Sequence, residues 1–216
     1  MEDGVAQKID SFFTQYKQQT FRKGEILLRA DDDPLGIYYL KAGTVKMYGI
    51  SRKGDELVLN IYKPVSFFPM AWAINNAENK YYYEALTDVE GWRAPKDKTI
   101  QFIKSNPDVL YDLVSRIYRG VEGVLMRMNY LMAGSAHSRL INEIFIQAKR
   151  FGKKNKETGV ELSMSEKDLA ALAGMTRETV SREMKTLKDK GLVLIEKNSI
   201  TITNMDQLEE ELSATL

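Results

Sequence analysis

The first half of the chain alternates short apolar runs with turn residues. Residues 26–28, 37–40, 44–48 and 57–62 are rich in β-branched and aromatic side chains, and Gly, Asp and Pro separate these runs at short intervals. Such spacing is typical of short antiparallel strands. We therefore predict a small antiparallel β-roll, sandwich or barrel between about Phe21 and Pro95.

The pattern changes after Pro95 to a helical one. Residues 97–104 suit a short helix, and a long helix is predicted from Asp108 to about Met132. Along it, apolar residues recur at alternating intervals of four and three, which is the seam of a coiled coil. We predict that two chains pair along this seam. Its residues are Leu110, Val114, Ile117, Val121, Val124, Met128 and Leu131.

A second arrangement of the long helix stays open. Leu113, Leu125 and Met132 widen the apolar stripe, so the helix could instead pack against the sandwich of its own chain. Gly120 and Gly123 would each weaken an isolated helix by about 1 kcal/mol relative to Ala, so we expect packing against a partner to hold the helix. Both arrangements can hold along different faces.

The last third of the chain contains start and stop signals for two short helices. Ser165 and Asp168 have the spacing of a capping box, and Gly174 suits a tight corner. Thr176 can cap a second helix that runs from Arg177 to about Lys190. Two helices joined by a tight turn form a helix-turn-helix. Residues 192–203 then read as a β-hairpin, or wing.

The second of these helices carries polar side chains suited to DNA. Arg177 can donate a fork of hydrogen bonds to guanine, and Glu178 can accept from cytosine. Residues 139–205 hold 13 Lys and Arg against 9 Asp and Glu, although the whole chain has a net charge of only +1. The alternative to DNA binding is a capped amphipathic helix whose charged face is only solvated. The candidate DNA-binding residues are Ser165, Thr176, Arg177, Glu178, Thr179, Ser181, Arg182, Lys185, Lys188 and Lys197.

Residues 168–182, with the core T-R-E-T-V-S-R, closely resemble the winged-helix signature of the Crp/Fnr family of transcription regulators. Gly43 and Gly54 fall where the family's β-roll has comparable residues. The resemblance implies an α+β chain with a cyclic-nucleotide-binding-like β-roll over 1–107, a dimerisation helix and hinge over 108–137, and a winged helix-turn-helix over 138–216. It further implies homodimers that bind two-fold symmetric operators and recruit or block RNA polymerase. The family's base-reading residues match Arg177, Glu178 and Arg182.

The residues with which family members hold a cyclic nucleotide are missing. Those members use a Gly-Glu-Leu segment and an Arg-Ser pair, whereas this chain has S-F-F-P-M-A-W over 66–72 and N-K-Y-Y-Y-E over 79–84. Lys80 supplies a charge without the bidentate fork of an arginine. We therefore do not expect cAMP to bind in the family's manner. A cAMP-type receptor with a rebuilt pocket is the alternative within the family.

Seven aromatic residues lie between positions 67 and 92. They either pack the roll and cover the long helix, or line an apolar pocket for a small organic effector. Regulation without any ligand is also open. The candidate pocket residues are Phe68, Trp72, Lys80, Tyr82 and Glu84.

Composition excludes several kinds of chemistry. The 216 residues include no Cys, which excludes disulfides, thiolate nucleophiles and Cys-ligated zinc or iron–sulfur clusters. We read the one histidine, His137, as interdomain or solvent-exposed rather than as a metal or haem ligand. We see no catalytic constellation, and a module that lost DNA binding should lack the cations above. The acidic start and the lack of a long apolar run predict a cytoplasmic chain without signal peptide or membrane span.

Overall fold

The structure is a computed structural model that describes residues 3–52, 54–155, 159–196 and 199–214, with the side chains of residues 3, 131, 133 and 155 outside that description. The chain divides into two compact units, Met1–Tyr118 and Arg119–Leu216. The boundary falls within helix α4 (Pro107–Ala133), which contributes residues to both units. Each unit is described by itself below.

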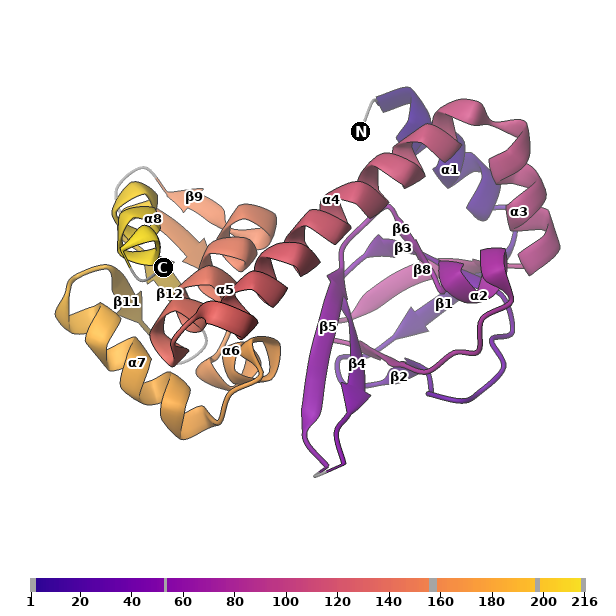
Figure 1. Ribbon diagram of the computed structural model, residues 1–216. Helices are drawn as coiled ribbons and strands as arrows, with labels where there is room; N and C mark the ends of the chain where they lie inside the picture. The colour runs from indigo at the N-terminus through magenta and orange to yellow at the C-terminus, as the bar shows by residue number, and fades with distance from the viewer. Residues whose placement is uncertain (1–2, 53, 156–158, 197–198, 215–216) are drawn as a thin grey trace. The chain divides into compact units, whose positions relative to one another are not determined.

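The first unit contains the predicted antiparallel β-roll (Figure 1). One four-stranded sheet has the order β1-β8-β3-β6 and the other the order β2-β7-β4-β5, with all pairs antiparallel. The strands are β1 (Lys17–Phe21), β2 (Ile26–Leu28), β3 (Ile37–Ala42), β4 (Val45–Ile50), β5 (Glu56–Tyr62), β6 (Ser66–Phe68), β7 (Tyr82–Ala85) and β8 (Val89–Ala94). The strands expected from apolar runs are confirmed. The apolar runs of the sequence do not predict strands β1, β6, β7 or β8.

Aromatic rings fill the interior of the roll. Phe68 stacks on Tyr83 with ring centroids 5.0 Å apart and on Tyr38 at 6.1 Å, and it packs at a tilt against Tyr62 at 4.8 Å. A neighbouring cavity bordered by Tyr38, Phe68 and Val89 has a volume of about 10 Å³. That volume is close to the minimum needed by one water molecule. The side chains themselves therefore pack the roll.

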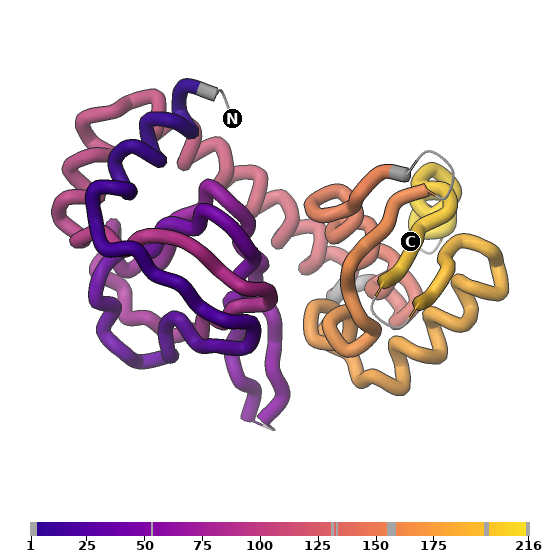
Figure 2. Tube along the Cα trace, turned by 180° about the vertical axis from the view of Figure 1, so that it is seen from behind, coloured from indigo at the N-terminus to yellow at the C-terminus, as the bar shows by residue number. Residues whose placement is uncertain are grey.

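Three helices cover the roll besides α4. They are α1 (Asp3–Phe13), α2 (Met70–Asn75) and α3 (Lys96–Ser105). The sequence reading did not assign α1, whose Ile9 and Phe13 are fully buried. Lys8 of α1 donates to Asp108 at the start of α4 at 2.5 Å, and Figure 2 shows the indigo helix beside that segment.

Helix α4 has two apolar faces. On one face, Val109 and Leu113 are buried in the core that also contains α1. Arg116 adds a hydrogen bond on this face: its Nη1 donates to the carbonyl oxygen of Val65 at 2.5 Å. The other face is the predicted seam, whose described side chains are 39–50% exposed. The helix thus packs against its own chain through Val109 and Leu113, whereas Leu125 and Met132, which also widen the stripe, are 59% and 84% exposed. Pairing of two chains along the seam stays a prediction. The exposed seam residues are Leu110, Val114, Ile117, Val121, Val124 and Met128; the side chain of Leu131 lies outside the described part.

The second unit packs four helices and a sheet around one apolar core. The sheet has the order β11-β12-β10-β9. Leu140, Ile144, Leu169 and Met184 are each fully buried in the core. The elements are α5 (Ala136–Phe151), β9 (Lys153–Asn155), β10 (Gly159–Leu162), α6 (Glu166–Ala173), α7 (Arg177–Asp189), β11 (Val193–Ile195), β12 (Ile200–Ile202) and α8 (Met205–Ser213).

Two features of this unit differ from the sequence reading. Helix α8, which no sequence pattern above predicts, follows the hairpin and buries Leu208 and Leu212 in the same core. The hairpin is also part of a larger sheet, since β10 pairs with β12. Both features depend on contacts between segments far apart in the sequence.

A buried ion pair joins the last turns of α4 to α5. Arg127 donates from Nε and Nη2 to the two carboxylate oxygens of Glu143, both at 2.8 Å. Glu143 is only 2% exposed, and Gln147 donates to it at 2.6 Å. Two parallel, charge-assisted bonds of this kind fix direction as well as distance. The pair therefore sets how the end of α4 meets α5.

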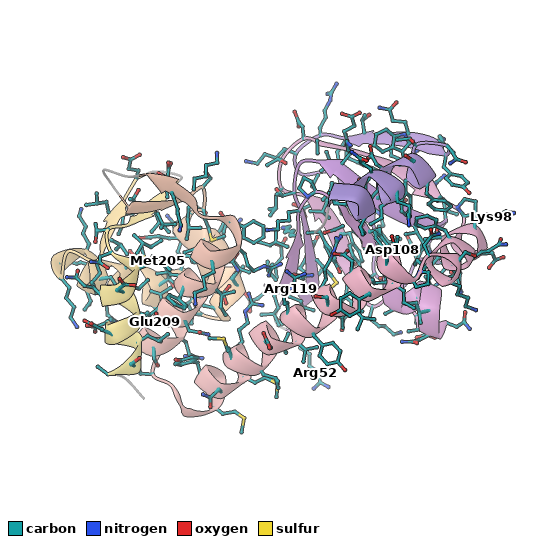
Figure 3. The ribbon with its side chains drawn as sticks, turned by 90° about the horizontal axis from the view of Figure 1, so that it is seen from above. Arg52, Lys98, Asp108, Arg119, Met205 and Glu209 are labelled. Carbon is teal, nitrogen blue, oxygen red and sulfur yellow. The ribbon has the colours of Figure 1, made fainter. Side chains whose placement is uncertain are left out.

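We predict that Arg127→Ala destabilises the second unit by about 3 kcal/mol, because it leaves the buried Glu143 carboxylate unpaired. Chemical unfolding followed by circular dichroism measures the change. Glu209→Ala removes an exposed charge from α8 of the same unit (Figure 3) and should cost about 0.5 kcal/mol or less. Equal costs for the two variants would show that the fork does not hold the unit together.

Candidate nucleic-acid interface

The two helices α6 and α7 form the predicted helix-turn-helix. At the start of α6, the backbone N–H of Asp168 donates to Oγ of Ser165 at 3.3 Å, and the backbone N–H of Ser165 donates to Asp168 at 2.9 Å. This is the predicted capping box. Gly174 ends α6 with φ at +61°, a conformation that residues with a Cβ adopt at a cost. The corner is thus set by local chemistry.

Helix α7 separates a buried stripe from a charged face. Thr176 caps its start by accepting from the backbone N–H of Thr179 at 3.2 Å. Val180, Met184 and Leu187 have no exposed surface, so the core fixes which side of the helix faces outward. The exposed residues of α7 include four cations and two carboxylates. They are Arg177, Glu178, Ser181, Arg182, Lys185, Thr186, Lys188 and Asp189.

The carboxylate in the first turn is held in its ionised form. The backbone N–H of Glu178 itself, then the hydroxyl of Thr176 and the charge of Arg177, lower the pKa of Glu178 below its ordinary value. Unpaired N–H groups at a helix start favour a negative charge in this way. An ionised Glu178 only accepts hydrogen bonds, as contact with the cytosine amino group requires.

The remaining candidate DNA-binding residues differ in whether their polar groups already make hydrogen bonds within the chain. The hydroxyl of Ser165 donates to Asp168 at 2.7 Å, and that of Thr179 lies 3.1 Å from the hydroxyl of Thr176, so these hydroxyls already serve the helix starts. The wing is present as β11 and β12, closed by a bond from the N–H of Glu196 to the carbonyl of Ser199 at 2.9 Å. The last candidate, Lys197, lies outside the described residues.

The five residues expected to line an effector pocket do not come together. Phe68 points into the roll, where it stacks on Tyr83. Tyr82 and Glu84 flank Tyr83 on the same strand, and neighbouring residues in a strand face opposite sides of the sheet. Tyr82 accordingly stacks on Tyr48 at 5.2 Å, outside that interior packing.

The polar members of that set are paired elsewhere. Glu84 accepts from Lys46 at 3.2 Å. Lys80 is exposed and pairs with Glu78 at 2.5 Å and Asp31 at 3.4 Å. Glu78, as a hydrogen-bond acceptor, is the main cause that raises the pKa of Lys80.

Trp72 lies on α2, where its Nε1 donates to Asp33 at 3.0 Å. The expected pocket of Phe68, Trp72, Lys80, Tyr82 and Glu84 is therefore not assembled. Adjacent aromatic positions along the sequence do not share a face.

His137 also lies differently from the expectation. Its side chain is 17% exposed, and its two ring nitrogens face Glu183 of α7 and Glu211 of α8. It is thus not solvent-exposed, and both of its partners belong to its own unit, Arg119–Leu216. Across the part of the chain that the structure describes, no group of three or more Asp, Glu or His side chains is arranged to hold a metal ion. In the same residues, no helix has the length and apolar character needed to span a membrane.

Comparisons with known proteins agree with this architecture. Residues 18–106 match the cyclic nucleotide-binding domain, and residues 138–211 match the Crp-like helix-turn-helix domain. The global nitrogen regulator of Nostoc sp. strain PCC 7120 is 26% identical over 191 residues, which are 85% of this chain and 84% of that protein.

Two solved structures show the same fold. The c-di-GMP-responsive regulator CLP of Xanthomonas campestris has a TM-score of 0.78 at 19% identity and covers 92% of this chain and 99% of its own. A CooA mutant from Carboxydothermus hydrogenoformans has a TM-score of 0.77 at 19% identity, with coverage of 97% and 90%.

The β-roll, the long helix and the winged helix-turn-helix define a DNA-binding transcription regulator with a cyclic-nucleotide-binding-like domain. The chain belongs to the Crp/Fnr family, which consists of transcription regulators rather than enzymes. The individual DNA contacts, and the division into 1–107, 108–137 and 138–216, stay predictions.

We predict that Arg177→Ala weakens binding to a specific operator by about 1–3 kcal/mol per half-site and relaxes the preference at one base pair. The reason is the loss of a bidentate donor from the first turn of α7. Fluorescence anisotropy with the operator and with single-base variants measures both effects. Unchanged affinity and preference would show that Arg177 does not contact a base.

Lys188→Ala provides the contrast at the other end of the same exposed face. Removing a phosphate contact should weaken binding to all sequences similarly and reduce the salt slope by about 1. Titrations at several salt concentrations test this. A change in base preference for Lys188→Ala would contradict its assignment to phosphate.

Proposed function

We propose that this protein is a homodimer that binds two-fold symmetric operators and regulates their transcription. The observation that carries the proposal is the combination of two exposed surfaces. One is the cationic face of α7, and the other is the apolar seam of α4. Paired chains would present two recognition helices to successive major grooves, about 34 Å apart.

The seam favours a second copy of this chain as the partner. Its described members lie at heptad spacing over three turns or more, and each keeps 39–50% of its surface exposed in the single chain. Contiguous apolar surface of this kind marks an interface. A heptad seam is complementary to itself, because the a and d side chains of one helix fit between those of the other. Pairing along it would give the symmetry of a palindromic operator.

For the first unit, we infer a sensor that does not hold cAMP in the manner of the nucleotide-binding relatives. Phe68 and Tyr83 occupy the roll interior, and Lys80 is engaged by Glu78 and Asp31. We also expect the protein to carry no cofactor. An unidentified small organic effector remains the proposed ligand class, and CLP, a fold relative, is described as responsive to c-di-GMP. RNA polymerase is the proposed partner at the promoter, in the cytoplasm.

The test is operator selection followed by quantitative binding. Purified protein is used to select sequences from a genomic fragment pool, and anisotropy then measures affinity at about 0.15 M salt with and without cAMP. Selection of palindromic sites bound equally well without cAMP is the expected result. Binding that requires cAMP would overturn the inference about the roll, and failure to select any site would overturn the proposed function.

We predict that Val121→Asp converts the dimer to monomers, because it places a carboxylate without a partner in an apolar interface. Light scattering after size-exclusion chromatography gives the mass directly. Asn129→Asp adds the same charge at an exposed position of α4 outside the seam and should leave the dimer intact. A dimeric Val121→Asp variant would place the interface on another surface.

A further inference from the structure

The chain's one histidine lies where α5 meets the recognition helix. His137 is in the first turn of α5, two residues after Ser135, which caps that helix. Its Nδ1 lies 3.1 Å from a carboxylate oxygen of Glu183, and its Nε2 lies 3.1 Å from one of Glu211. Glu183 belongs to α7 and Glu211 to α8. One imidazole thus links α5, on which it lies, to α7 and α8.

This geometry suits only one protonation state of the ring. A neutral imidazole donates from one nitrogen and accepts at the other, while an ionised carboxylate only accepts. A neutral His137 would therefore leave one ring lone pair facing a carboxylate oxygen. The imidazolium donates from both nitrogens and satisfies both partners. Histidine is also the side chain that ordinarily changes charge between about pH 5 and 8.

The other charged groups around the ring come from α7 and α8. Arg182 of α7 donates to Glu183 at 3.2 Å, and Lys190, which caps the end of α7, donates to Glu211 at 2.5 Å. Lys190 is the main cause that lowers the pKa of Glu211, and the bond to His137 adds to it. Glu209 and Glu210 of α8 are exposed and make no bond to the ring among the described contacts.

The position of Glu183 makes the contact relevant to DNA. Glu183 is half-buried on the inward side of α7, next to Met184 and directly after Arg182 of the charged face. The apolar stripe fixes which side of α7 faces the core. Bonds to α5 and α8 additionally resist sliding and tilting of α7, because they are directional.

We propose that His137 is a positioning residue for the recognition helix, and that its imidazolium ties α7 to α5 and α8 so that operator affinity falls when the ring loses its proton. This rests on the proposed function, in which α7 reads the operator. The contact requires ionised Glu211 and protonated His137. Because the pKa of Glu211 is lowered, its contribution is lost only as the solution becomes acidic. The contact should therefore be weaker at pH 8 than at pH 6, the range across which a histidine ordinarily loses its proton.

The first experiment observes the ring itself. The full chain, prepared without a histidine tag and with ¹⁵N-labelled histidine, gives the nitrogen signals of a single imidazole. Glu183→Gln and Glu211→Gln should each lower the pH at which the ring loses its proton by about 0.5–1 unit. Glu210→Gln, which neutralises an exposed carboxylate on the same helix, should not. Equal titrations in all four proteins would overturn the contact.

The second experiment measures operator affinity at pH 6 and pH 8. The parent protein should lose about five-fold in affinity between the two. His137→Gln should bind weakly at both values, and His137→Arg, whose cation persists and can donate to both carboxylates, should bind tightly at both. Operator binding with the same pH dependence in the parent and His137→Gln would overturn the role of His137. Absence of operator binding by the parent at either pH would instead refute the proposed function.

Discussion

The structure depends first on the packing of α4, which contributes to the cores of both compact units. Val109 and Leu113 are buried in the first core, and Tyr130 belongs to the second. Arg127 adds its fork to Glu143. These contacts bury one side of α4 and leave the heptad seam on its other side exposed. Because a long helix with an uncovered apolar seam is unfavourable in water, the same packing that completes the single chain also creates the proposed dimer interface.

In the second unit, apolar and polar contacts have separate roles. The buried stripe of α7 fixes the rotation of the helix and therefore presents Arg177 and its neighbours outward. Directional bonds act at the edges of the same core, where Arg127 meets Glu143 and His137 meets two carboxylates. Apolar packing tolerates small shifts, whereas hydrogen-bonded charges do not. The placement of a recognition helix to within the reach of base edges needs both.

The candidate effector pocket shows where sequence reasoning stops. Phe68 and Tyr82 are both candidate lining residues in the sequence, since aromatic composition does not reveal which ring points inward. Strand alternation places Tyr83 on the inward face with Phe68, and Tyr82 on the opposite face, where it stacks on the buried Tyr48. The charges of Lys80 and Glu84 were equally visible in the sequence, but their partners come from other strands and loops. A pocket depends on those long-range neighbours, so its residues could not be chosen from one segment.

The sequence by itself determined the elements whose signals are local. Capping residues, turn glycines and helical periodicity within about 25 positions define the helix-turn-helix, and heptad spacing defines α4. Tertiary structure alone decided the rest: that α1 and α8 complete the two cores, that β9 and β10 extend the wing sheet, that aromatic rings fill the roll, and that His137 lies between two carboxylates. The physical reason is that short elements and polar clusters gain their stability from contacts between distant segments, which no local pattern records.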